Sequence, residues 1–151
     1  MKPYRFFDIS HISILFFLFS LNGCSKTPEQ HFNQAQLMVQ KGDNKAAIIE
    51  LKTVLQAQPN NREARQLLGK VFLKDGAYPN AEKELSKARS LGVPDAQVLP
   101  GLADAYVHMG EPAKALALKL PESGVNQHTL AAFHNLQAQA HLMLGNRAEA
   151  A

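Results

Sequence analysis

Glycines and small residues recur along the chain with a period of about 34 residues. The glycines are separated by 34, 34 and 35 residues and stand at Gly42, Gly76, Gly110 and Gly145. Small residues lie five after and seven before each glycine, at Ala47, Ala81, Ala115, Ala150, Ala35, Gly69, Ala103 and Ala138. Bulky side chains lie four before it, at Met38, Phe72, Tyr106 and His141. This spacing predicts antiparallel helix pairs, with glycine in the turn and small residues where the helix axes approach.

The composition agrees with helices. After residue 25, Ala, Leu, Gln, Lys and Glu dominate, and the chain has no tryptophan and only 7% aromatic residues. The 34-residue pattern resembles the tetratricopeptide (TPR) repeat, with Leu68, Gly69, Phe72, Ala81 and Leu85 in family positions. The resemblance implies an all-α TPR solenoid of antiparallel helix pairs.

The resemblance divides the chain into four repeats. We expect them at residues 28–61, 62–95, 96–130 and, incomplete, 131–151. Pro59 stands where the family places a helix-stopping proline between repeats, and Pro121 is expected to cut short the second helix of the third repeat. The last helix carries leucines without a complete partner, Leu136, Leu142 and Leu144. We therefore expect the chain to be a fragment of a longer array.

The N-terminal segment, residues 1–23, has the order of a secretory signal peptide. A short basic segment precedes an apolar stretch about half as long as a membrane-spanning helix. Leu21-Asn22-Gly23-Cys24 resembles the lipobox of bacterial lipoproteins, which implies lipidation of Cys24 and a tether over 24–27. A chance cysteine behind an ordinary signal peptide is the alternative. Because Ser25 rather than aspartate follows the cysteine, the lipoprotein pattern implies the periplasmic face of the outer membrane.

A closer resemblance covers roughly residues 24–120. The segments 41–52, 63–70, 81–85 and 91–100 resemble the N-terminal part of TPR-repeat lipoproteins of PEP-CTERM/exosortase systems (PrsT-like). This implies a non-catalytic adaptor in export or assembly of surface polysaccharide or proteins. The alternatives are a generic outer-membrane assembly or pilus-biogenesis TPR lipoprotein, and the TPR front end of a truncated envelope enzyme.

The charge and the polar residues favour a protein-binding scaffold over an enzyme. The net charge of +3 is far below that of a concentrated nucleic-acid-binding face, and one cysteine excludes an intrachain disulfide. His134 and His141 lie about 10 Å apart along one helix, too far to share a metal ion, so we expect structural histidines. We interpret Glu82 and Glu84, with Lys83 and Lys87, as a solvated helix face. No catalytic motif, metal site or cofactor is expected.

The first helix of each TPR repeat lines the concave face in this family. Its groove positions fall on Phe32, Gln36, Gln66, Lys70, Lys74, Asp104, His108, Asn135 and Gln139. Because Phe32 and Gln36 replace the lysine and asparagine by which some TPR domains hold a chaperone's terminal carboxylate, that clamp is absent. We expect a cell-envelope protein partner. Lys70 and Lys74 carry the hypothesis of an acidic peptide or anionic polymer, against ordinary solubilising lysines.

Overall fold

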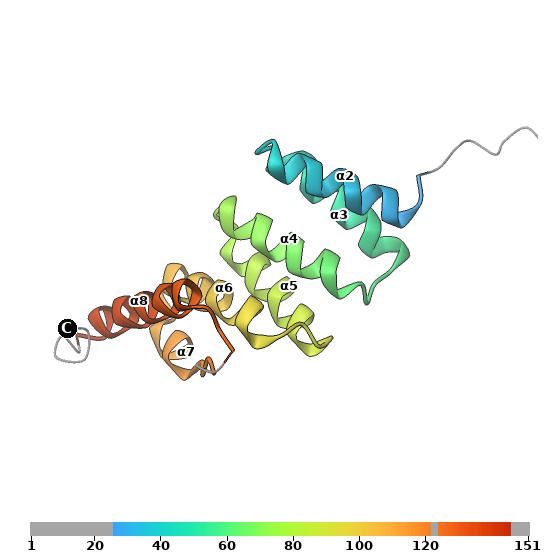
Figure 1. Cartoon of the computed structure of the whole chain (residues 1–151). Helices are drawn as coiled ribbons and strands as arrows, with labels where there is room; N and C mark the ends of the chain where they lie inside the picture. Colours follow the sequence, from blue (N-terminus) through green and yellow to red (C-terminus); the bar gives the residue numbers. More distant parts are fainter. Residues whose placement is uncertain (1–25, 122–123, 146–151) are drawn as a thin grey trace, which may run out of the picture.

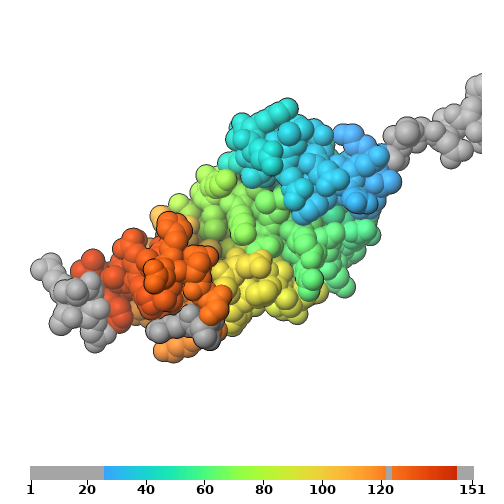
Figure 2. All heavy atoms as spheres, viewed as in Figure 1, coloured from blue at the N-terminus to red at the C-terminus, as the bar shows by residue number. Residues whose placement is uncertain are grey.

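The computed structural model describes residues 26–121 and 124–145, which form seven α-helices and no strand (Figure 1). The helices are α2 (Pro28–Gln40), α3 (Asn44–Ala57), α4 (Arg62–Lys74), α5 (Tyr78–Ser90), α6 (Asp95–His108), α7 (Pro112–Ala117) and α8 (Gln127–Met143). Consecutive helices pack as pairs, α2 with α3, α4 with α5 and α6 with α7. The body is elongated, with α2 and α3 at one end and α8 at the other (Figures 1 and 2).

Local sequence signals set the helix ends. Thr27 and Gln30 form a reciprocal capping box at the start of α2, and Asn61 caps α4 by accepting from the Ala64 amide at 2.9 Å. The turn glycine of the second pair, Gly76, has a φ of 73°, a conformation that other residues adopt only with strain. The predicted turn positions are therefore occupied by residues that suit them.

Small residues lie buried where helices approach. Fully buried alanines include the predicted contact positions Ala35, Ala47, Ala81, Ala103 and Ala115. Ala138 is only half-buried and its neighbour Ala140 is buried instead. In the second pair, a Cβ added at Gly69 would stand 2.6 Å from Leu85 Cγ, so glycine is what allows α5 to approach α4.

Two contacts at the same repeat position join the first and second helices. Arg65 Nη1 donates to Glu84 Oε2 at 2.6 Å in the second pair, and His31 Nδ1 contacts Glu50 Oε2 in the first. Both pairs are 19 residues apart in sequence. In the third repeat, the equivalent positions hold Leu99 and Leu118, which belong to one hydrophobic cluster. This repeat position therefore carries a polar contact in the first two pairs, and two leucines of one hydrophobic cluster in the third.

The third repeat ends earlier than Pro121 requires. A helix commonly continues to the residue before a proline, yet α7 already ends at Ala117 and Leu118 is extended, with φ −70° and ψ 137°. Leu118 and Leu120 pack against the core, whereas Lys119 between them is exposed, which is the alternation of an extended segment. Tertiary burial of these two leucines therefore accounts for the end of α7.

The last described helix also begins earlier than expected. α8 starts at Gln127 rather than near Ala131, because Asn126 accepts a hydrogen bond from the Thr129 amide at 2.8 Å and caps the helix there. At its other end, Leu142, Met143 and Leu144 are about half exposed. The predicted signal peptide, Cys24 and Ala150 lie outside the described residues. Within the part that is described, no helix has the length and apolarity needed to cross a bilayer.

Candidate partner-binding face

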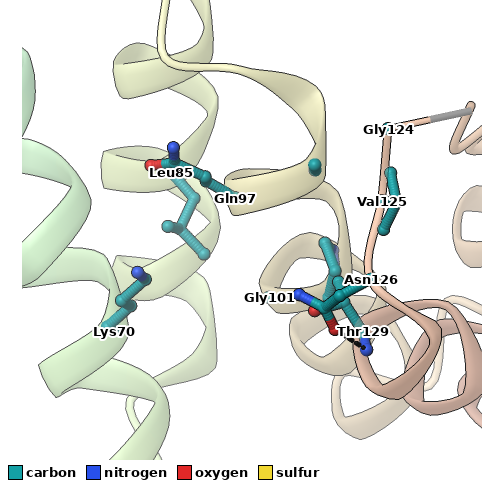
Figure 3. A pocket seen from close by; sticks show the side chains of 10 residues that line it. Lys70, Leu85, Gln97, Gly101, Gly124, Val125, Asn126 and Thr129 are labelled. Carbon is teal, nitrogen blue, oxygen red and sulfur yellow. Dashed lines mark hydrogen bonds between the residues drawn. The ribbon is translucent and has the colours of Figure 1, made fainter.

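The first helices of the second and third pairs share one face of the molecule. Gln66 of α4 donates from Nε2 to Gln97 Oε1 of α6 at 3.0 Å. The start of α8 lies beside α6 on the same face (Figure 3). We call the surface built by α4, α6 and the start of α8 the first-helix face.

A hollow of about 540 Å³ lies on the first-helix face. Its lining residues come from α4, α5, α6 and the segment that enters α8: Lys70, Leu85, Ala96, Gln97, Pro100, Gly101, Gly124, Val125, Asn126 and Thr129. Lys70 stands on one side and Asn126 and Thr129 on the opposite side (Figure 3). A smaller hollow of about 310 Å³, beside Gln66 and Val93, shares Gln97 with it. The two hollows form a discontinuous groove across the face.

Lys70 is the charged residue of the larger hollow. Partial burial lowers its pKa, since removing water disfavours the ammonium form. Among the described residues, no carboxylate lies within ion-pair distance of it. The side chain nevertheless remains exposed to solvent overall, so Lys70 is a surface cation with protein atoms on one side and no compensating charge.

Other predicted groove residues are already engaged. Asp104 Oδ1 lies 3.0 Å from His108 Nδ1, and the His108 ring stacks on Tyr78 with a centroid distance of 4.5 Å. Phe32 packs against the first hydrophobic cluster and is half-buried rather than open to a ligand. These three residues make contacts within the protein, so they are less available to a partner than the exposed groove residues.

The remaining predicted groove residues are open but dispersed. Gln36, Lys74, Asn135 and Gln139 are exposed, on α2, α4 and α8. None of them lines the larger hollow. Of the predicted groove residues, Lys70 lines the larger hollow and Gln66 lines the smaller one. Lys74 therefore does not form a joint basic site with Lys70 in this hollow.

The interpretation of a solvated face on α5 agrees with the exposure of Lys83 and Lys87 but is wrong for the two acidic residues. Glu84 is only 12% exposed and binds Arg65, while Glu82 accepts hydrogen bonds from Ser86 and from the Tyr106 hydroxyl at 3.3 Å. Burial, and then the charge of Glu82, raises the pKa of Tyr106. Both carboxylates are interhelical contacts, because α5 turns this side towards α4 and α6.

The expectation that His134 packs in the structure is also wrong, because the core position is one residue earlier. His134 is exposed, and the adjacent Phe133 occupies the core at 2% exposure. His141, by contrast, is half-buried. Phe133 lies 34 residues after the buried Leu99, so the core position of α8 keeps the 34-residue register, whereas the last two turn glycines are 35 residues apart.

Sequence reasoning missed Gln97, Asn126 and Thr129 as residues of the hollow. Gln97 occupies the second position of the third repeat, and the 34-residue register places Glu63 there in the second. Asn126, three residues before Thr129, is the signature of a helix cap and could have marked the start of α8. The approach of this segment to Lys70 depends on the short α7 and has no local signal.

Comparison with known proteins supports the architecture. Residues 38–100 match the tetratricopeptide repeat family, which covers the second half of the first pair, the whole second pair and the start of α6. No curated protein matches the chain. TPR repeats are scaffolds for protein–protein interaction, and the closer resemblance to PEP-CTERM-system lipoproteins stays a prediction. The matched segment and the packed helix pairs together identify the fold as an all-α TPR solenoid.

Proposed function

We propose that the protein is a membrane-anchored adaptor that holds an extended segment of a cell-envelope protein on its first-helix face. The observation that carries the proposal is the groove formed by the two hollows around Gln97. Such a groove, lined by both apolar and polar groups, suits an extended peptide segment better than a globular surface.

The envelope setting rests on the sequence. A signal-like segment and a lipobox-like Leu21–Cys24 support secretion and lipidation, and the resemblance to PEP-CTERM/exosortase lipoproteins supports a role in export of surface polysaccharide or protein. An adaptor needs no catalytic group of its own. The partner supplies the activity, and the anchor raises its local concentration at the membrane.

Site-specific photocrosslinking in a lipoprotein-processing bacterium tests the binding face. A photoreactive amino acid replaces Lys74 or Gln97, which are exposed on the first helices α4 and α6. Lys45 and Lys87, which are exposed on second helices, are the matched control positions. We expect one envelope protein to crosslink reproducibly from the first-helix positions and not from the controls. Equal capture from both sets would contradict a dedicated face.

Mass spectrometry of the membrane fraction tests the anchor. We expect the natural chain to carry acyl groups on an N-terminal Cys24 and the Cys24→Ala chain to lack them. An unmodified natural chain recovered in soluble form would refute the membrane attachment, but not the binding face.

A further inference from the structure

Acidic and basic side chains lie on different sides of the second helices α3 and α5. The acidic residues of these two helices each contact a first helix: Glu50 contacts His31 of α2, Glu84 contacts Arg65 of α4, and Glu82 contacts Tyr106 of α6. The lysines of the same helices are exposed instead, at Lys45, Lys52, Lys83 and Lys87. The outward surface of α3 and α5 is therefore basic, although both helices carry both kinds of charge.

The positive charge of this surface is not compensated by its neighbours. Within the part of the chain that the structure describes, none of these lysines forms an ion pair. The one arginine of α5, Arg89, is paired with Asp95. The turns before α3 and α5 each lie beside one lysine and one aspartate, so they leave the excess unchanged: Lys41 with Asp43, and Lys74 with Asp75.

An exposed isoleucine lies among these lysines. Ile49 is 66% exposed, more than any other large apolar residue that is described, and lies four residues after Lys45 and three before Lys52. Residues at these spacings share one side of a helix. Amphipathic helices bind the headgroup region of a bilayer through this combination of apolar side chains and lysines. We call the outward surface of α3 and α5 that carries Lys45, Ile49, Lys52, Lys83 and Lys87 the second-helix face.

A hollow of about 480 Å³ lies on the second-helix face. Lys52 of α3 and Lys83 of α5 line it from two helices, and the buried Leu68 and Phe72 of α4 lie beneath them. Lys70, which lines the hollow of the first-helix face, is two residues from each of these α4 residues and so about 200° around the helix. The two faces therefore lie on opposite sides of α4, and the hollow between the lysines has room for a phosphate headgroup.

The start of the described chain lies against the same helix. Lys26 Nζ is 3.9 Å from Glu50 Oε1 of α3, and Lys26 and Gln56 line one small hollow. Gln56 also lines the hollow between α3 and α5, so the chain start adjoins the second-helix face. Cys24 is two residues before Lys26, and two residues of chain reach at most about 7 Å. A lipid on Cys24 would hold this side of the body close to the membrane surface.

We infer that the second-helix face docks on anionic lipid headgroups of the membrane that holds the anchor, with Ile49 in the headgroup region. The inference rests on the anchor of the proposed function and adds an orientation, in which the first-helix face is turned towards the partner. An anionic bilayer matches this face better than an acidic protein does, because the lysines surround an apolar side chain and adjoin the anchor. Attraction between lysines and an anionic leaflet falls off within a Debye length, so it needs the proximity that the anchor supplies.

Fluorescence quenching in vesicles tests the docking with the full acylated chain. A dye is attached to Gln56→Cys on α3 or, as the matched control, to Gln97→Cys on α6, and acylation leaves no thiol at Cys24. The vesicles contain a headgroup-labelled quencher lipid in phosphatidylcholine, or in an equal mixture of phosphatidylcholine and phosphatidylglycerol. We expect quenching at Gln56 to be several times stronger in the anionic vesicles and to fall at high salt, and quenching at Gln97 to be independent of lipid charge. Equal quenching of Gln56 in the two vesicles would overturn the inference.

Matched lysine variants locate the charge that binds the lipid. Lys52→Gln combined with Lys83→Gln should lower the ratio of docked to undocked chain about tenfold. Lys70→Gln combined with Lys74→Gln removes the same charge from α4 and should change the ratio less than about twofold. An equal loss in the two double variants would contradict a dedicated face, because net charge alone would then explain the binding. Circular dichroism checks that each variant keeps its helices.

The same vesicles separate this inference from the proposed function. If the chain carries no acyl groups and is not retained by vesicles, the anchor of the proposed function fails and the docking fails with it. If the acylated chain is retained but the dye at Gln56 is not quenched, only the docking fails. Photocrosslinking from Gln56 to an acidic envelope protein instead of lipid would mean that the lysines bind a protein, and would also overturn the inference.

Discussion

The second and third helix pairs begin alike and differ in their second helices. α5 runs for 13 residues, whereas α7 has six. In the second pair, Leu85 fills the space that Gly69 and Gly101 leave, so α5 touches both neighbouring first helices. In the third, an extended segment delivers its leucines to the core, and the chain returns early to start α8.

This difference explains how the hollow on the first-helix face arises. If the second helix of the third pair were as long as α5, residues 118–121 would be helical, and we would not expect Gly124–Asn126 to lie beside Lys70. The short α7 instead leaves a segment that forms one wall of the larger hollow. The regular pair supplies the rigid wall opposite, through α4 and Leu85.

The largest expected effect on stability is at Leu85, where α5 of the regular pair contacts both neighbouring first helices. Leu85→Ala removes a fully buried side chain and should lower the free energy of unfolding by about 2–5 kcal/mol. The matched change in the irregular pair, Leu118→Ala, removes a half-buried leucine and should cost about 1 kcal/mol. Urea unfolding followed by circular dichroism measures both. Equal losses would mean that the two pairs are equally well packed.

The Arg65–Glu84 ion pair can be replaced by the two leucines that occupy the equivalent positions of the third pair. Arg65→Leu alone leaves Glu84 without its partner at 12% exposure and frees the Pro59 carbonyl, and should cost about 1–3 kcal/mol. Adding Glu84→Leu copies the third pair and should restore most of that stability. The exposed Arg62–Glu63 pair is the control, and Arg62→Met should cost no more than about 0.5 kcal/mol. A double variant as unstable as the single would show that the ion pair is needed in itself.

The two glycines around Leu85 should respond differently. An alanine Cβ at Gly69 would lie 2.6 Å from Leu85 Cγ and 3.3 Å from its backbone nitrogen, so net destabilisation of about 1 kcal/mol is expected after the gain in helix propensity. At Gly101 the nearest atoms are the side-chain ends Leu85 Cδ1 and Leu73 Cδ1, which can move, so Gly101→Ala should be close to neutral. Thermal unfolding compares the stabilities of the two variants. A greater loss of stability in Gly101→Ala than in Gly69→Ala would mean that the tighter contact of Leu85 is with α6.

The smallest expected effect has the opposite sign. Because partial burial lowers the pKa of Lys70, the folded state holds the charged form at a cost at neutral pH, and Lys70→Met should slightly stabilise the chain. The unfolded chain binds more protons between the lowered pKa and the ordinary lysine value, so the natural chain gains stability as pH rises through that window. Unfolding of both chains at neutral and alkaline pH should show their difference shrinking. A constant difference would exclude a charge effect.

The fold could be predicted from the sequence because its signals are local and repeated. Glycine in the turn and small residues at the helix crossings recur at a fixed period, and each acts within one helix pair. The face of Glu84 was misjudged because its partner Arg65 is on another helix. The same 19-residue spacing between His31 and Glu50 carries that information, once the repeats are aligned.

The hollow could not be predicted because it depends on where the chain leaves the repeat pattern. Lys70 was identified from its repeat position, but its neighbours Asn126 and Thr129 come from a segment outside that pattern. Their placement follows from the burial of Leu118 and Leu120, a tertiary effect that no periodicity describes. The placement of an irregular segment therefore has to be taken from the structure, even when the repeats around it can be predicted from the sequence.

The change from polar partners in the first two pairs to leucines in the third, at positions 19 residues apart, also bears on how the chain avoids folding errors. Similar repeats risk pairing a helix with the wrong neighbour while the chain collapses. α6 already packs against α5 across the boundary between the pairs. If it met α5 in the register used within a pair, Leu99 would face Glu84 and bury the carboxylate without a donor, which is a costly arrangement. The first two repeats share compatible partners and lack this safeguard against exchange between themselves. The two leucines of the third repeat therefore favour packing of α6 against the segment that contains Leu118 over packing of Leu99 against Glu84.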